Sequence, residues 1–199
     1  MERIKTAIVG ASGYTGQELL RILLQHPSVE LVAATSRSEA GRSLAEVFPR
    51  FRGLPGAELA FIAPEADAIA ATGASAAFLA LPHGVAAEIA TALLDRHLKV
   101  IDLSADFRLS DPAVYEEFYG HPHPAPELLE RAVYGLPEVR PEAIAEAALV
   151  ASPGCYPTSI SLPLLPLLRA GLLETDSLVA NSMSGVSGAG RKADIPLLF

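Results

Sequence analysis

Cys155, the single cysteine of the chain, is the residue whose type and surroundings best suit covalent chemistry. It follows an apolar run at 148–151 and the turn Ser152-Pro-Gly154, and a long apolar segment at 157–169 comes next. This order predicts that the sulfur lies at the N-terminus of a helix, where unpaired N–H groups and the helix dipole favour the reactive thiolate. A lone cysteine is otherwise often a small buried apolar residue. The glycine before it clears room for a substrate, so we interpret Cys155 as a nucleophile.

A thiolate beside a nicotinamide supports one reaction particularly well. It attacks an acyl carbon, expels a leaving group and holds a thioester, which a hydride then reduces to an aldehyde. A general acid or base is needed to move protons, and all five histidines precede the cysteine. We place His83 near the cofactor, and we expect His121 and His123 on the surface, in a Pro-rich loop at 120–126.

The dinucleotide site is predicted from the glycine-rich segment Gly10-Ala-Ser-Gly13-Tyr-Thr-Gly16. It lies between an apolar strand expected at 6–9 and an amphipathic helix expected at 15–25. Glycines in this position permit a tight turn and let backbone N–H groups approach a pyrophosphate. The spacing GxxGxxG is a weaker signal than GxGxxG, and a purely structural turn is the alternative. We predict cofactor contacts from Gly10, Ser12, Gly13, Tyr14, Thr15 and Gly16.

The end of the second expected strand, at 29–35, indicates which dinucleotide is bound. A carboxylate there binds the ribose 2′-hydroxyl of NAD, whereas an arginine accommodates the 2′-phosphate of NADP. The sequence reads Ser36-Arg37-Ser38, with Glu39 one position later. Arg37 is also compatible with an ordinary solvated residue, but two hydroxyls and a guanidinium favour NADP.

The remaining pattern predicts an α/β fold. Further strands are expected at 78–81, 99–103 and 177–183, and further helices at 85–95 and from Asp111-Pro112 onward. Strands that alternate with helices imply a parallel sheet with helices on both faces. We therefore expect a Rossmann-like parallel sheet domain at 1–148, followed at 149–199 by the start of a second α/β (α+β) catalytic domain.

Composition narrows the class of protein. Half of the 199 residues are hydrophobic and 19% are charged, which is typical of a folded protein. The net charge of −8 argues against a nucleic-acid partner, which would require a basic patch. One cysteine and a start without an apolar signal core favour the cytoplasm. The uncharged stretch at 68–87 is broken by Gly73, Pro82 and Gly84, so we interpret it as a buried strand with flanking turns and expect neither a membrane span nor a metal site.

Six short segments together give the chain a resemblance to a known family, the N-acetyl-gamma-glutamyl-phosphate reductases of arginine biosynthesis. The segments are Gly10-Ala-Ser-Gly-Tyr-Thr-Gly-Gln-Glu18, Thr35-Ser-Arg-Ser38, Leu81-Pro-His-Gly84, Asp102-Leu-Ser-Ala-Asp-Phe-Arg108, Ser152-Pro-Gly-Cys-Tyr-Pro-Thr158 and Ser184-Gly-Val-Ser-Gly-Ala-Gly-Arg191. The resemblance implies reduction of N-acetyl-L-glutamyl 5-phosphate by NADPH to N-acetyl-L-glutamate 5-semialdehyde, with release of phosphate.

The resemblance also implies roles for particular residues. Cys155 takes the acyl group, and the segment from Ser184 to Gly190 approaches the nicotinamide. Arg108 is a candidate for binding a substrate anion, though equally for a structural ion pair. The second domain mediates oligomerisation, which implies a homodimer or homotetramer. Further contacts implied by the segments are Pro82, His83, Ser187 and Gly188 for the cofactor and Ser184 for the small acyl-phosphate substrate.

Members of this family are longer than 199 residues, and their catalytic histidine is expected well after the cysteine. We therefore expect a partial chain that binds NADPH but reduces substrate poorly. Three alternatives stay open. Two share the chemistry, namely a lysine-pathway reductase of carrier-linked aminoadipyl phosphate and an aspartate-semialdehyde dehydrogenase. The third is a non-catalytic NADP-binding or thiol redox-sensor module.

Overall fold

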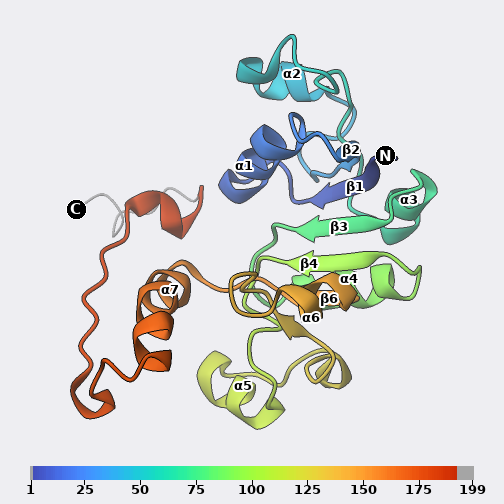
Figure 1. The fold of residues 1–199 in the computed structure, drawn as a ribbon. Coiled ribbons are helices and arrows are strands. Elements are labelled where there is room, and N and C mark those ends of the chain that lie inside the picture. Colours follow the sequence, from blue (N-terminus) through green and yellow to red (C-terminus); the bar gives the residue numbers. More distant parts are fainter. Residues whose placement is uncertain (1, 192–199) are drawn as a thin grey trace.

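The computed structural model describes residues 2–191. At its centre is a six-stranded sheet in which every neighbouring pair is parallel, in the order β2-β1-β3-β4-β6-β5 (Figure 1). The strands are β1 Ile4–Val9, β2 Val29–Ala34, β3 Ala76–Leu79, β4 Lys99–Asp102, β5 Val133–Tyr134 and β6 Leu149–Ala151.

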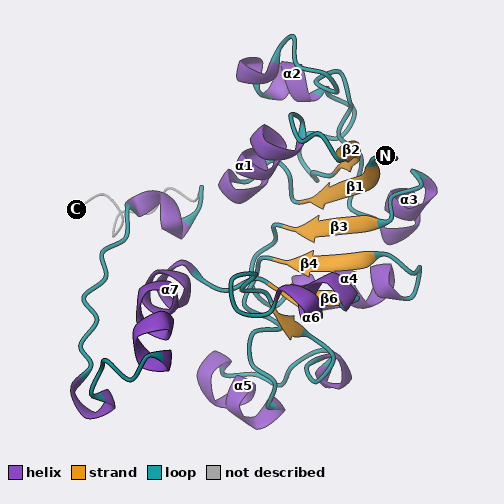
Figure 2. Cartoon of the chain, viewed as in Figure 1, coloured by secondary structure: helices purple, strands orange, loops and turns teal. Residues whose placement is uncertain are grey.

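Helices lie on both sides of this sheet, as the alternating pattern predicts (Figure 2). The α-helices are α1 Tyr14–Leu23, α2 Leu44–Val47, α3 Ala66–Ala71, α4 Ala86–Leu94, α5 Pro112–Tyr119, α6 Pro141–Glu146 and α7 Cys155–Arg169. Residues 2–191 also contain four 3₁₀ helices: η1 Pro49–Phe51, η2 Pro126–Leu128, η3 Thr175–Ser177 and η4 Val186–Ala189. The predicted α/β class with a parallel, Rossmann-like sheet is confirmed.

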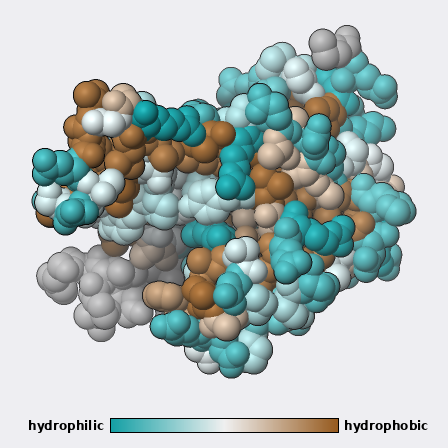
Figure 3. Space-filling view, turned by 60° about the horizontal axis from the view of Figure 1, so that its bottom comes forward, coloured by the Kyte–Doolittle hydropathy of each residue, from teal (hydrophilic) through white to brown (hydrophobic). Residues whose placement is uncertain are grey.

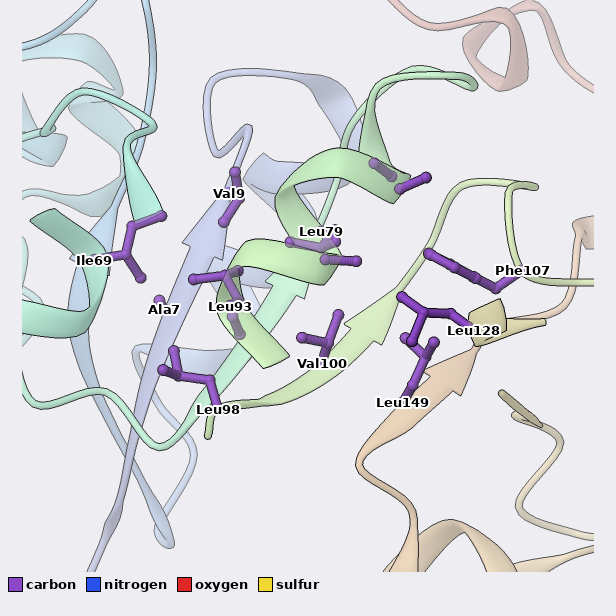
Figure 4. Close-up of a cluster of buried hydrophobic side chains, with 14 of the residues drawn as sticks. Ala7, Val9, Ile69, Leu79, Leu93, Leu98, Val100, Phe107, Leu128 and Leu149 are labelled. Atoms are coloured by element: carbon purple, nitrogen blue, oxygen red, sulfur yellow. The ribbon is translucent and has the colours of Figure 1, made fainter. Parts of the chain in front are cut away.

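The core divides along the pleat of the strands. In β1, Ala7 and Val9 face a cluster formed mainly with α3 and α4, which Figure 4 shows, whereas Ile8 faces a second cluster under α1 and α2. Successive side chains of a strand point to opposite faces, so a strand buried on both faces is apolar throughout. This explains why the short apolar runs of the sequence correspond to the interior strands.

Helix boundaries follow local chemistry. Asp111 caps α5 as predicted, with its Oδ1 accepting the N–H of Ala113 at 2.8 Å and Pro112 in the first position. The stretch at 68–87 holds strand β3 with turns on both sides, at 72–73 and 83–85, as predicted, and its outermost residues extend into α3 and α4. No helix among residues 2–191 is both long and apolar enough to cross a membrane.

After Gly154 the chain leaves the sheet and continues into α7. None of the residues of α7 is buried, and large apolar side chains such as Leu172 and Val179 are exposed beyond it. Figure 3 shows hydrophobic side chains gathered on this part of the molecule, at the left of the view. The predicted strand at 177–183 is wrong: residues 178–185 form no helix or strand, and within residues 2–191 no strand pairs with them.

Candidate active site

A cavity of about 380 Å³ opens at the carboxyl ends of β1, β2 and β3. Because β2 and β3 lie on opposite sides of β1, the loops that follow these strands diverge here, which is the usual place for a ligand in an open α/β sheet. Six of the predicted cofactor residues line it, namely Gly10, Ser12, Ser36, Arg37, Ser38 and Pro82. The other lining residues are Val9, Thr35, Pro64, Leu81, Val85, Glu88 and Ile89.

The glycine-rich loop requires glycine at two of its three positions. Gly10 has a φ of +82°, and a Cβ there would lie 2.4 Å from the carbonyl oxygen of Ala80. A Cβ at Gly16 would lie 2.5 Å from the Cα of Ala11. Gly13 is the N-cap of α1 and provides no side-chain cap, so first-turn N–H groups of α1 stay available for an anion. This cradle fits a pyrophosphate.

Hydrogen bonds fasten the glycine-rich loop to the end of β2. The hydroxyl of Thr35 accepts the N–H of Gly10 at 3.2 Å, and its carbonyl accepts the N–H of Ala11 at 2.9 Å. The hydroxyls of Ser12 and Ser36 lie 2.9 Å apart. The glycine-rich loop and the residues at the end of β2 therefore form one wall of the cavity.

The charges at the end of β2 are arranged as an NADP site requires. Arg37 is exposed and lines the cavity. Glu39 does not line it; one of its carboxylate oxygens pairs with the guanidinium of Arg42 at 2.6 Å, and the other accepts the hydroxyl of Ser38 at 3.4 Å. The carboxylate that could favour a ribose hydroxyl is thus engaged elsewhere.

Cys155 is exposed and is the first residue of α7, as predicted. The N-cap of this helix is Gly154, again without a side-chain cap. The turn before the cysteine is anchored to the sheet, since the N–H of Ser152 donates to the carbonyl of Asp102 at 2.8 Å. The sulfur therefore follows the carboxyl end of β6, at the same edge of the sheet as the cofactor cavity.

Arg108 lies directly beside the cysteine turn. Its Nε donates to the carbonyl of Ser152 at 2.8 Å and its Nη2 to that of Leu103 at 3.0 Å. Its Nη1 lies 3.1 Å from the point that a Cβ on Gly154 would occupy. Within residues 2–191 no carboxylate forms a salt bridge with it, so the ion-pair alternative finds no support there. Glycine at 154 thus also makes room for this guanidinium.

The sequence reasoning missed two buried carboxylates, Asp102 at the end of β4 and Asp106 in the loop that follows it. Asp106 accepts the N–H groups of Gly84 and Ala87 at 2.8 and 3.2 Å. Burial raises the pKa of Asp102 to about 6, although its Oδ2 accepts the hydroxyl of Ser104 at 2.7 Å. The alternation Asp-x-Ser-x-Asp was a visible signal, because polar residues directly after a buried strand face the carboxyl edge of a parallel sheet.

The histidines separate into exposed and buried ones. His83 is exposed and does not line the cavity, and its Nδ1 accepts the N–H of Ala105 at 3.0 Å. His121 is exposed as predicted. The surface position predicted for His123 is wrong: it is 5% exposed, its ring packs against Tyr115 at 4.6 Å, and burial lowers its pKa. The Pro-rich loop folds against α5, and its composition gives no sign of this packing.

The segment from Ser184 to Arg191 is exposed, and its last residue contacts the glycine-rich loop. Arg191 donates to the carbonyl of Ser12 at 2.8 Å, and its guanidinium lies 5.7 Å from the centre of the Tyr14 ring. Ser187 and Gly188 fall in η4 and do not line the cavity. The cofactor roles of Tyr14, Thr15, Ser187 and Gly188 and the substrate role of Ser184 stay predictions.

Fold, loop and cysteine together are those of one class of oxidoreductase, and family comparison agrees. Residues 5–147 match the model described as semialdehyde dehydrogenase, NAD binding domain. Residues 155–199 match the semialdehyde dehydrogenase dimerisation domain. The chain belongs to the semialdehyde dehydrogenase family.

Within this family, individual relatives share a much higher sequence identity with the chain. The chain is 67% identical over 199 residues to N-acetyl-gamma-glutamyl-phosphate reductase of Akkermansia muciniphila, covering 100% of this chain and 57% of that protein. It is 53% identical over 196 residues to the reductase of the same name from Nitrosococcus oceani, covering 98% of this chain and 56% of that protein. The chain thus spans a little over half the length of these curated relatives.

Solved structures show the same fold. Aspartate semialdehyde dehydrogenase II from Vibrio cholerae, complexed with ASA, has a TM-score of 0.66 at 20% identity, over 96% of this chain and 49% of its own. Aspartate semialdehyde dehydrogenase with NADP from Candida albicans has a TM-score of 0.59 at 16% identity, over 86% of this chain and 48% of its own. At these identities the likeness concerns the fold alone.

Proposed function

We propose that the protein carrying this chain reduces an acyl phosphate to an aldehyde with NADPH, through a thioester on Cys155. One arrangement carries the proposal. The cysteine begins α7 at the same sheet edge as the dinucleotide cavity, and Arg108 lies beside its turn. A nucleophile, a cation for a phosphate group and a dinucleotide cavity are the parts that this reaction requires.

The chain's own residues account for the first half of the reaction. The Cys155 thiolate attacks the acyl carbon and forms a C–S bond. The C–O bond to phosphate breaks, and the phosphate leaves with its electron pair. Arg108, which two carbonyls hold in place, is positioned to neutralise the departing anion.

The second half returns the enzyme to its starting state. When bound, NADPH supplies a hydride to the thioester carbon. The C–S bond then breaks and its electrons return to the sulfur of Cys155, so the aldehyde leaves and the thiolate is restored. The balance is acyl phosphate, NADPH and one proton on one side, and aldehyde, NADP⁺ and inorganic phosphate on the other.

The choice of NADP over NAD rests on Arg37 and its two flanking serines at the cavity, and on the pairing of Glu39 with Arg42. The backbone cradle from Gly10 to Gly16 would hold the pyrophosphate. The proposal further includes a cofactor domain at 1–148, a catalytic domain beginning at 149, a homo-oligomer and a cytoplasmic location.

The substrate proposed is N-acetyl-L-glutamyl 5-phosphate, the acyl phosphate of arginine biosynthesis. It is supported by the resemblance of the six sequence segments and by the names of relatives more than half identical to this chain. The segment Ser184 to Arg191 argues for this substrate over carrier-linked aminoadipyl phosphate.

Mass spectrometry of the intact protein tests the proposal. Incubation with N-acetyl-L-glutamyl 5-phosphate and no NADPH should add the acyl mass to Cys155, and NADPH should then remove it as aldehyde. Cys155→Ser should accept no acyl group and still bind NADPH. Aspartyl phosphate, offered in parallel, should acylate far more slowly. If oxidation is the only change found at the thiol, the module is a redox sensor and the reductase proposal fails.

A further inference from the structure

The N-terminus of α4 is capped by a residue that is distant from it in the sequence. Its own N-cap residue, Val85, offers no side-chain hydrogen bond. Asp106 supplies the cap instead, since its Oδ1 accepts the N–H of Gly84 at 2.8 Å and its Oδ2 that of Ala87 at 3.2 Å. The Asp106 side chain is fully buried, so both bonds are shielded from water. Charge-assisted bonds of this kind, at the positive end of a helix, hold the backbone firmly.

The segment that Asp106 holds forms one wall of the dinucleotide cavity. Five residues of this segment line the cavity: Leu81, Pro82 and Val85, which precede α4, and Glu88 and Ile89, which lie in its first turns. A third hydrogen bond between the same two segments runs from the N–H of Ala105 to His83 Nδ1 at 3.0 Å. The position of this wall is therefore set by the loop that follows β4.

Asp106 is itself fixed by its neighbours. Its N–H donates to the hydroxyl of Ser104 at 3.1 Å, and that hydroxyl donates to Asp102, the last residue of β4. The loop then continues to Arg108, which holds the turn before the cysteine. One short loop thus braces the cavity wall at one end and the cysteine turn at the other.

We propose that Asp106 is a positioning residue for the dinucleotide: through the N-terminus of α4 it sets the cavity wall against which the cofactor binds. The inference rests on the proposed NADP site. It requires a carboxylate, because an amide would turn an N–H donor toward one of the two backbone N–H groups.

The test is a titration of the intact protein with NADPH, followed by nucleotide fluorescence. Asp106→Asn should raise the Kd for NADPH about tenfold, which corresponds to the loss of about one charge-assisted hydrogen bond. The KM for NADPH should rise by a larger factor than kcat falls. Asp111→Asn is the matched control: it makes the same chemical change in a cap on α5, a helix that does not line the cavity, and should leave the Kd unchanged.

Ser104→Ala is a second variant, which tests the proposal even if Asp106→Asn does not fold. It keeps the Asp106 carboxylate and removes the hydroxyl that accepts the Asp106 N–H and donates to Asp102, and it should raise the Kd about threefold. A wild-type protein that does not bind NADPH would refute the proposed function. The positioning role alone would be refuted by a different result: the wild type binds NADPH, and a folded Asp106→Asn or Ser104→Ala variant has a Kd within twofold of the wild-type value.

Discussion

Gly16→Ala should damage both stability and cofactor binding, by an amount that follows from the geometry. The added Cβ would lie 2.5 Å from the Cα of Ala11 and from the carbonyl oxygen of Gly10, where ordinary contacts begin at 3.4 Å. Both obstacles are backbone atoms, so α1 must move away from the loop by about 0.9 Å. Overpacking of this kind costs about 1–3 kcal/mol, so the Tm should fall by about 2–12 °C.

Gly13→Ala is the matched control for this change. A Cβ at Gly13 would meet only the carbonyl oxygen of Gly10, at 3.6 Å, and the backbone there is extended with a φ of −73°. Thermal unfolding followed by circular dichroism should place its Tm close to that of the wild type, and NADPH titration should show a loss of affinity much larger for Gly16→Ala. Equal Tm values for the two variants would refute the steric argument.

Three further changes test other parts of the site. Arg37→Glu should raise the Kd for NADPH at least about tenfold and leave that for NADH nearly unchanged, as measured by fluorescence titration; parallel losses for both nucleotides would contradict it. Burial raises the folded-state pKa of Asp102 from 3.8 to about 6, so this group costs stability above the folded value and none below the unfolded value. Its ionisation should therefore lower the unfolding free energy by about 2 kcal/mol between pH 4 and 6. Asp102→Asn should remove that fall in urea unfolding curves, and an unchanged pH profile would exclude Asp102 as its source. Arg191→Ala removes the bond to Ser12, and the Kd for NADPH should rise about fivefold; a Kd equal to that of the wild type would show that the contact does not support the loop.

The interior strands, the cap at Asp111 and the helix start at Cys155 were predictable because each depends on residues that are neighbours in the sequence. The composition of the cavity was predictable in part, since Ser36 and Arg37 directly follow a strand. The buried position of His123 and the capping of α4 by Asp106 were not, because both depend on contacts between distant segments. The strand predicted at 177–183 does not form for a different reason. Its residues favour a strand, but within residues 2–191 no neighbouring strand pairs with them.

The position of β1 inside the sheet has a consequence for how the chain folds. β1 precedes the other five strands in the chain, yet one of its two neighbours, β3, pairs Ala76 with Thr6, and this pairing closes a long loop. Parallel sheets with such distant pairings fold slowly, because the entropy of loop closure is lost before the contacts form. During synthesis the glycine-rich loop can contact β2 early. The opposite cavity wall and its support at Asp106 can form only after later segments have been synthesised. The nucleotide cradle is therefore completed in stages, and a nascent chain that ends before residue 106 lacks the brace.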